Sequence, residues 1–167
     1  MQRIQKITPC LWFDYQAEAA AEFYCSIFDH SKVTAITHYG KAGFELHGRP
    51  EGSVMTVSFE LDGQTFTGLN GGPVFTFNEA VSFQVNCQTQ DEVDHFWNSL
   101  SEGGDKAAQQ CGWLKDKFGV SWQIVPIALM HMMKDPDTAK SQRAMQAMLH
   151  MKKIDIAALE QAFAGQS

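Results

Sequence analysis

The fold of this chain is decided by residues 54–69, VMTVSFELDGQTFTGL. Apolar and small polar side chains alternate up to the Asp62-Gly63 pair, and a second strand-like run follows that pair. An Asp-Gly pair between alternating runs indicates a two-residue hairpin turn, because both central residues need a positive φ. The segment therefore predicts an antiparallel hairpin with strands at 54–61 and 64–69.

Two further strands and a helix are predicted before the hairpin. Ile4–Phe13 and Val33–Tyr39 are rich in β-branched and aromatic residues, as strands are. Between them, from Ala17 to Phe28, apolar residues recur three and four positions apart, which predicts a helix with one apolar face. The first half of the chain is thus expected to be a strand, a helix and three strands.

The same order is expected to return after residues 70–73, NGGP, which break both helix and strand. A strand over 81–87 leads into Thr89–Glu92, a capping box that opens a second helix. Three short strands are expected after that helix, at Gln109–Trp113, Leu114–Lys117 and Val120–Val125. The chain after Pro126 is expected to be helical.

These patterns predict an α+β protein of two βαβββ modules with mixed sheets, and with helices at the C-terminus. The first module is expected over 1–73, the second over 74–126, and the helical extension over 127–167. A length of 167 residues suits one compact domain, because domains of roughly 100–150 residues are the commonest.

Composition and charge exclude several kinds of partner. With 44% hydrophobic residues the chain can bury a core without disulfides or metal. The net charge is -6 and basic residues form no stripe, so nucleic acid and anionic membranes are not expected as partners. No run approaches the ~20 apolar residues that span a bilayer, and the four cysteines form no C-x-x-C pair. A cytoplasmic protein is expected.

Side-chain alternation separates the residues that face the helices from those on the open face of each sheet. Across the hairpin the predicted open-face pairs are Thr56 with Leu69, Ser58 with Thr67, and Glu60 with Thr65. The helix side of the strand over 81–87 is expected to carry Val81, Phe83, Val85 and Cys87. The last strand is expected to leave Ser121 and Gln123 on the open face.

The open face so obtained is mostly small, polar and uncharged. A sheet face in contact with water usually carries Lys and Glu, and a core face carries Leu and Val, so this composition favours a cavity that binds a small molecule. The alternative is a polar face that only contacts solvent and binds nothing. The expected lining residues are Thr8, Cys10, Trp12, Ser58, Thr67, Ser82, Gln84 and Gln123.

Several segments resemble the PhnB-like branch of the vicinal oxygen chelate superfamily, also called the glyoxalase/bleomycin-resistance fold. They are Ile7–Pro9, Glu22–Tyr24, Leu69–Pro73, Cys111–Trp113, Phe118–Gln123 and Lys152–Asp155. Such proteins are often labelled 3-demethylubiquinone 3-methyltransferase-like. The resemblance implies paired βαβββ modules, a cupped sheet and usually a homodimer. In metal-dependent relatives it also implies a divalent ion in the cup, held by His, Gln and Glu.

The resemblance carries four ligand positions onto this chain, near Thr8, near Thr67 or Leu69, near Ala80 or Ser82, and at Gln123. Hydroxyls, an alanine and one amide do not hold zinc, iron or hard divalent ions tightly. We therefore expect no metal in the cup. No nucleotide-like cofactor is expected either, because the chain has no Gly-rich strand-to-helix loop followed by an acidic residue.

Two open-face residues are weak catalytic candidates. Cys10 is a conceivable nucleophile, but its activation needs a neighbouring base or positive charge. Glu60 would act as a general base if it were buried.

Three functions follow from these observations. The leading one is a homodimeric protein that binds a small organic ligand in a metal-free cup. The second is a metal-independent enzyme that uses Cys10 or Glu60. The third is a structural or interaction protein whose cup is filled by its own side chains, with the Met-rich C-terminal helices as its functional surface.

Overall fold

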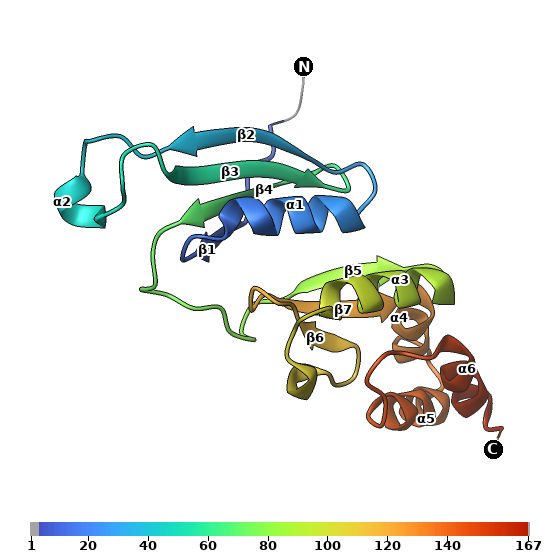
Figure 1. The fold of residues 1–167 in the computed structure, drawn as a ribbon. Coiled ribbons are helices and arrows are strands. Elements are labelled where there is room, and N and C mark those ends of the chain that lie inside the picture. The colour runs from blue at the N-terminus through green and yellow to red at the C-terminus, as the bar shows by residue number, and fades with distance from the viewer. Residues whose placement is uncertain (1–3, 167) are drawn as a thin grey trace. The chain divides into compact units, whose positions relative to one another are not determined.

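The structure is a computed structural model, and it describes residues 4–166. The chain divides into two compact units, 1–77 and 78–167 (Figure 1). The elements of the first are β1 (Cys10–Phe13), α1 (Ala17–Ile27), β2 (Lys32–His38), α2 (Phe44–His47), β3 (Val54–Leu61) and β4 (Gln64–Asn70). Those of the second are β5 (Phe83–Cys87), α3 (Gln90–Ser101), the 3-10 helix η1 (Lys106–Ala108), β6 (Trp113–Lys115), β7 (Ser121–Pro126), α4 (Ile127–Met133), α5 (Thr138–Met148) and α6 (Ile156–Ala164).

The first unit contains a four-stranded mixed sheet in the order β1-β4-β3-β2. β1 runs parallel to β4, and the other pairs are antiparallel. The predicted hairpin is confirmed: β3 and β4 meet at Asp62 and Gly63, whose φ angles are 47° and 76°. The predicted pairing is confirmed as well, with Thr56 opposite Leu69, Ser58 opposite Thr67 and Glu60 opposite Thr65.

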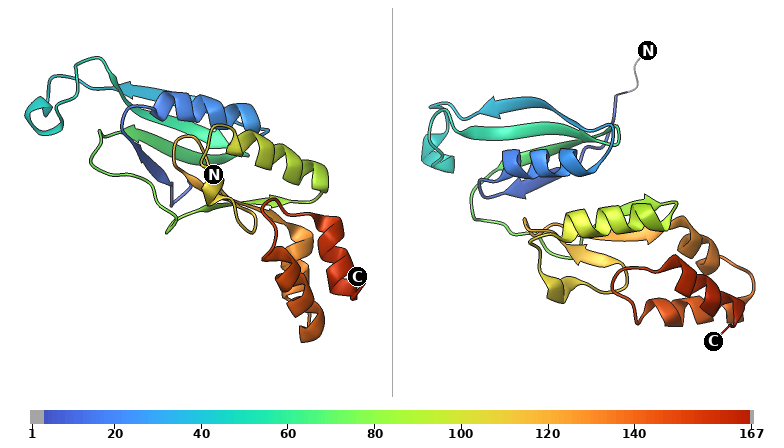
Figure 2. Two further views of the ribbon diagram at one scale, coloured as in Figure 1. Left: turned by 60° about the horizontal axis from the view of Figure 1, so that its bottom comes forward. Right: turned by 45° about the vertical axis from the view of Figure 1, so that its right-hand side comes forward.

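Helix α1 covers one face of this sheet (Figures 1 and 2). It buries Ala17, Tyr24 and other residues of its apolar stripe, above the buried Val57 and Phe59 of β3. A Cβ added to Gly68 of β4 would lie 3.2 Å from the Ala17 Cβ. Small residues at this crossing therefore let the helix approach the sheet closely.

Asn70, at the end of β4, supplies the cap that α1 lacks. The N-cap residue Gln16 makes no side-chain cap bond, and instead Ala17 N donates to Asn70 Oδ1 at 2.9 Å. Asn70 Nδ2 donates to Val54 O at 3.1 Å, and the Tyr39 hydroxyl donates to Asn70 O at 2.6 Å. The side chain and backbone of Asn70 thus join the helix to β3, β4 and the residue that follows β2.

The second unit repeats the strand arrangement with three strands, in the order β5-β7-β6. β5 is parallel to β7, and β6 is antiparallel to it. α3 lies on one face and buries Val93, Trp97 and Leu100. Its predicted capping residue is confirmed, because Glu92 N donates to Thr89 Oγ1 at 3.2 Å, while Gln88 N donates to the Glu92 carboxylate at 2.6 Å.

The α+β fold is confirmed, but the strand expected over Gln109–Trp113 is wrong. This segment forms a turn with a single bridge between Gln110 and Trp113. Its backbone cannot continue a strand, because Cys111 and Gly112 have φ angles of 52° and 83°. The second sheet therefore has three strands among the described residues, where four were expected.

Two other expected strands begin later than their composition suggested. β1 starts at Cys10, because Pro9 has no N–H to donate. The side-chain amide of Gln5 binds the backbone N and O of Thr65, in place of a strand ladder. Val81 was expected on the helix side but is 69% exposed, because β5 begins only at Phe83.

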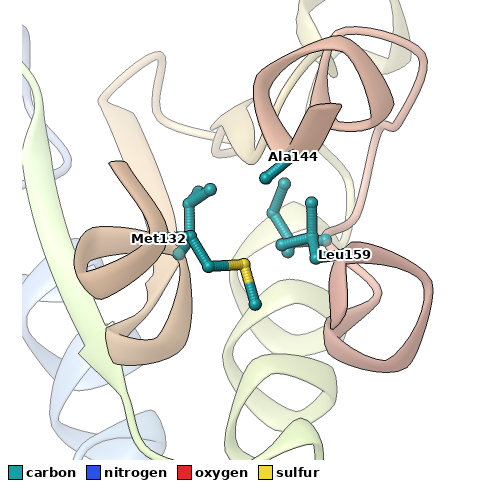
Figure 3. Close-up of a cluster of buried hydrophobic side chains, with 5 residues drawn as sticks. Met132, Ala144 and Leu159 are labelled. Carbon is teal, nitrogen blue, oxygen red and sulfur yellow. The ribbon is translucent and has the colours of Figure 1, made fainter. Parts of the chain in front are cut away.

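The C-terminal helices α4, α5 and α6 enclose an apolar cluster of their own (Figure 3). Its buried members are Leu129, Met132, Ala144, Ile154 and Leu159. The turn before β6 is bonded to the segment between α5 and α6, because Cys111 N donates to Met151 O and Gly112 N to Lys152 O, both at 2.8 Å. Within residues 4–166, no helix is long and apolar enough to cross a membrane.

Candidate functional site

The open face of the first sheet is organised in rows across its strands. One row consists of Trp12, Leu69, Thr56 and Thr37, and the next of Cys10, Thr67, Ser58 and Ala35. A third row contains Thr65, Glu60 and Lys32. The first two rows are uncharged, and the only charges of the three rows are Glu60 and Lys32 at one edge, with a carboxylate-to-Nζ distance of 4.0 Å.

Four of the expected lining residues share this face: Cys10, Trp12, Ser58 and Thr67. Trp12, Ser58 and Thr67 are half-buried, whereas Cys10 is exposed. Thr8 does not belong to a row, because it precedes β1 and is exposed. The row pattern follows from the register of β1 on β4, which places Cys10 beside Thr67.

The Trp12 side chain lies at one side of this face and is held there by two contacts. Its indole Nε1 donates to Gly72 O at 2.9 Å, and its ring lies edge-on to Phe75 at 4.9 Å between centroids. A Cβ added to Gly71 would lie 2.2 Å from the same ring. Glycine is therefore required at 71 so that the chain can pass over the indole.

Neither catalytic candidate has the surroundings of an activated group. Although Cys10 is exposed as a residue, neighbouring groups desolvate its thiol and raise the thiol pKa, so the thiol is protonated at neutral pH and is a poor nucleophile. The Glu60 side chain is 33% exposed beside Lys32 and forms a solvated ion pair there, which is not the environment of a buried base. Burial raises the pKa of Cys87, behind the second sheet, to about 12.

The open face of the second sheet contains a chain of side-chain amides. Gln84, Gln123 and Trp113 lie in one row across β5, β7 and β6. Gln84 Nε2 donates to Gln123 Oε1 at 3.4 Å, and Gln123 Nε2 donates to Ser82 Oγ at 2.8 Å. The three expected lining residues of this unit are thus connected, with Gln123 in the middle.

Beside this row lies a charged group that sequence reasoning missed. Lys115 of β6 is paired with Ser121 of β7, and its Nζ binds the Glu79 carboxylate. The hydrogen bond from Lys115 holds the pKa of Glu79 below its ordinary value. Alternation indicates the place of Ser121, but Glu79 lies outside any strand, so no periodicity indicates its contact with Lys115.

The positions that hold a metal in metal-dependent relatives do not suit one here. Thr8 and Ala80 are exposed and lie outside the strands, and the Ser82 hydroxyl is bound by the Gln123 amide. Hydroxyls and one amide lack the carboxylate, imidazole or thiolate groups that hold such ions. Among residues 4–166, no three His, Cys, Asp or Glu side chains gather as a metal site.

A shallow hollow lies between α5 and α6, away from both sheets. Arg143 and Gln146 of α5 line it, together with His150, which follows that helix. The Arg143 guanidinium donates to Ala162 O at 3.0 Å and to Phe163 O at 2.8 Å, so it satisfies the last carbonyls of α6. Arg143 therefore has a structural role at this hollow.

Comparison with known proteins gives one family and several solved structures. The model of a family described as 3-demethylubiquinone-9 3-methyltransferase matches residues 5–125. The PhnB protein of Bacillus cereus is 36% identical, covers 73% of this chain and 99% of its own, and has a TM-score of 0.62. A protein of Pseudomonas aeruginosa is 18% identical with a TM-score of 0.55, covering 74% of this chain and 98% of its own.

A fosfomycin resistance protein of Listeria monocytogenes is 15% identical, covers 78% of this chain and 98% of its own, and has a TM-score of 0.48. None of the curated proteins matches the chain. The family match ends at residue 125, so helices α4, α5 and α6 lie beyond it.

Proposed function

This chain belongs to the 3-demethylubiquinone-9 3-methyltransferase family, in the PhnB-like branch of the vicinal oxygen chelate superfamily, and from that premise we propose that it binds a small organic ligand without a metal. The ligand lies on the open face of the first sheet, and the working protein is a homodimer, as relatives of this branch usually are.

The observation that carries the proposal is the pair of uncharged rows on the first sheet. Ser58 and Thr67 are paired half-buried hydroxyls, which can both donate and accept hydrogen bonds. Trp12 and Leu69 in the adjacent row supply apolar contact. Apolar and aromatic groups with a few placed polar groups are the composition of small-molecule sites.

The proposal includes no methyl transfer, although the family description names it. A nucleotide-like methyl donor is usually held at a glycine-rich turn between a strand and a helix, where the backbone can approach it closely. Here β1 leads to α1 through Asp14–Gln16, and β5 leads to α3 through Gln88 and Thr89. Neither connection contains a glycine.

The test is native mass spectrometry of the full-length protein purified from its host. The expected result is a dimer that retains an organic molecule of small mass, which is released on denaturation. A dimer that retains a metal ion instead, or a protein free of any small molecule at several growth stages, contradicts the proposal.

A double variant localises the ligand. Ser58→Val with Thr67→Val removes both hydroxyls at nearly constant volume and keeps β-branched side chains in the strands, so the fold is expected to persist. Retention of the ligand should fall by about tenfold, since two hydrogen bonds are lost. The matched control is Thr138→Val at the exposed start of α5, which should retain the ligand like the unaltered protein.

A further inference from the structure

We propose that Lys115 and Ser121 form an anion-binding site on the open face of the second sheet, and that its ligand is a small carboxylic acid whose carboxylate replaces Glu79 on Lys115. The inference goes beyond the proposed function, because this site belongs to the second unit and the uncharged rows belong to the first. All of the residues involved belong to the second unit and lie on the open face of its sheet or beside it.

The first observation is an unused hydrogen-bonding group. Ser121 is 2% exposed, and its Oγ has no hydrogen-bond partner. A buried hydroxyl without a partner destabilises the fold, so such groups call for an explanation, and an absent ligand is one. Ser121 is directly paired with Lys115 across β6 and β7, so an acceptor that reaches the lysine is also near this hydroxyl.

The second observation is that Lys115 already binds a carboxylate that can leave. Glu79 is 61% exposed and comes from a segment without helix or strand, whereas the Lys115 side chain is 24% exposed and fixed on β6. A partly solvated ion pair of this kind contributes little stability. A ligand carboxylate can therefore take its place with no change in local charge.

The third observation concerns the body of the ligand. Trp113 lies two residues before Lys115 on the same face of β6, about 7 Å away along the strand. In the same row, Gln123 is oriented by its bonds to Ser82 and Gln84. A compact acid can thus place its carboxylate at Lys115 and an apolar or aromatic body against Trp113.

The test compares acids with their neutral amides by titration calorimetry on the full-length protein. The probes are benzoate, phenylacetate and hexanoate, each paired with its amide. At least one acid should bind at least about tenfold more tightly than its amide, because a charge-assisted bond to Lys115 is lost in the amide.

Two variants should change the affinity for that acid in opposite directions. Lys115→Met should weaken binding by about tenfold, because it removes the cation. Glu79→Gln should strengthen binding by about threefold, because it removes the competing carboxylate. Lys117→Met is the matched control: this lysine follows β6 and lies beside Gly103, and its replacement should leave the affinity unchanged.

Three results would overturn the inference: equal affinities for acid and amide, a Lys115→Met protein that binds like the unaltered one, or weaker binding by Glu79→Gln. Failure of all three acids to bind even the Glu79→Gln protein overturns it too. These results do not bear on whether the protein retains a neutral ligand from its host. The proposed function is therefore judged separately, by mass spectrometry.

Discussion

The two units follow the same plan but complete it differently. In the first, α1 is followed by the seven-residue β2, which forms one edge of a four-stranded sheet. In the second, α3 is followed by η1 and a turn, and the sheet has three strands. The C-terminal segment accepts the N–H groups of Cys111 and Gly112 instead. Where a strand is missing, backbone N–H groups need other acceptors. Here carbonyl groups of the C-terminal extension accept them.

The units also differ in how much apolar surface they leave in water. Among the described residues, ten large apolar side chains are exposed, and eight of them lie in the first unit. They include Ile36 on β2 and both Phe44 and Leu46 around α2. The second unit has helices α4 to α6 as additional cover. The first unit is therefore the better candidate for contacts with a second copy of the chain.

Removing the apolar contact between the C-terminal extension and the turn before β6 should have the largest effect. Ile154 is 1% exposed, and its Cγ1 would lie 3.2 Å from a Cβ on Gly112. Ile154→Ala should lower the free energy of unfolding by about 2–5 kcal/mol, measured by urea denaturation. Leu149→Ala, at a 53% exposed position in the same extension, is the control. Equal losses in the two variants would mean that the extension is not packed as described.

In the first unit, the crossing of Gly71 over Trp12 should be the most sensitive point. Gly71→Ala places a methyl group inside the indole ring, so the ring has to move and its bond to Gly72 O is lost. We expect a loss of up to about 3 kcal/mol and an altered tryptophan emission. Gly40→Ala, where nothing lies within 4 Å, should change neither measurement.

The two helix caps allow a direct comparison of the units. Asn70 caps α1 from a distant strand and is buried, whereas Thr89 caps α3 locally and is exposed. Asn70→Ala should cost about 2 kcal/mol and Thr89→Ala about 1 kcal/mol, because only the first also leaves Val54 O without its donor. The order should appear in urea unfolding, and a reversed order would contradict the role given to Asn70.

The smallest effect is expected from the ion pair between α3 and the C-terminal segment. Hydrogen bonds from Lys153 and Gln90 lower the pKa of Asp94 below its ordinary value of 3.8. A lowered folded-state pKa adds stability above the unfolded value, and that stability is lost as the pH falls through the folded value. Asp94→Asn should therefore cost a few tenths of a kcal/mol at pH 7.

Below the lowered pKa of Asp94, the variant and the unaltered protein should be equally stable. The difference is read from urea unfolding at a series of pH values. A difference that persists unchanged into strong acid would exclude the ion pair as its source.

Much of the first sheet could be predicted because its signals are local. The Asp62-Gly63 turn fixes where β3 and β4 meet, and strand alternation then fixes which of their residues share a face. Local composition gave wrong strand boundaries where the backbone conformation of single residues prevents a strand. The left-handed Cys111 and Gly112 end a segment whose residue types suggested a strand, and Pro9 delays the start of β1.

The candidate site also has a part that the sequence predicts and a part that it does not. Ser58 and Thr67 were placed opposite each other by alternation and register, and Gln123 was placed on the open face. The contact of Glu79 with Lys115 and the unpartnered hydroxyl of Ser121 could not be foreseen. Glu79 and Lys115 are 36 residues apart, and no repeating pattern records such a contact.

The sequence by itself determined the hairpin, the sorting of its side chains between two faces and the start of α3, because turns, alternation and local caps act between near neighbours. Only the tertiary structure decided that Asn70 caps α1, that the C-terminal segment bonds the turn before β6, and that Lys115 holds Glu79. Each of these joins residues far apart in the chain, and such contacts form only when packed elements bring them together.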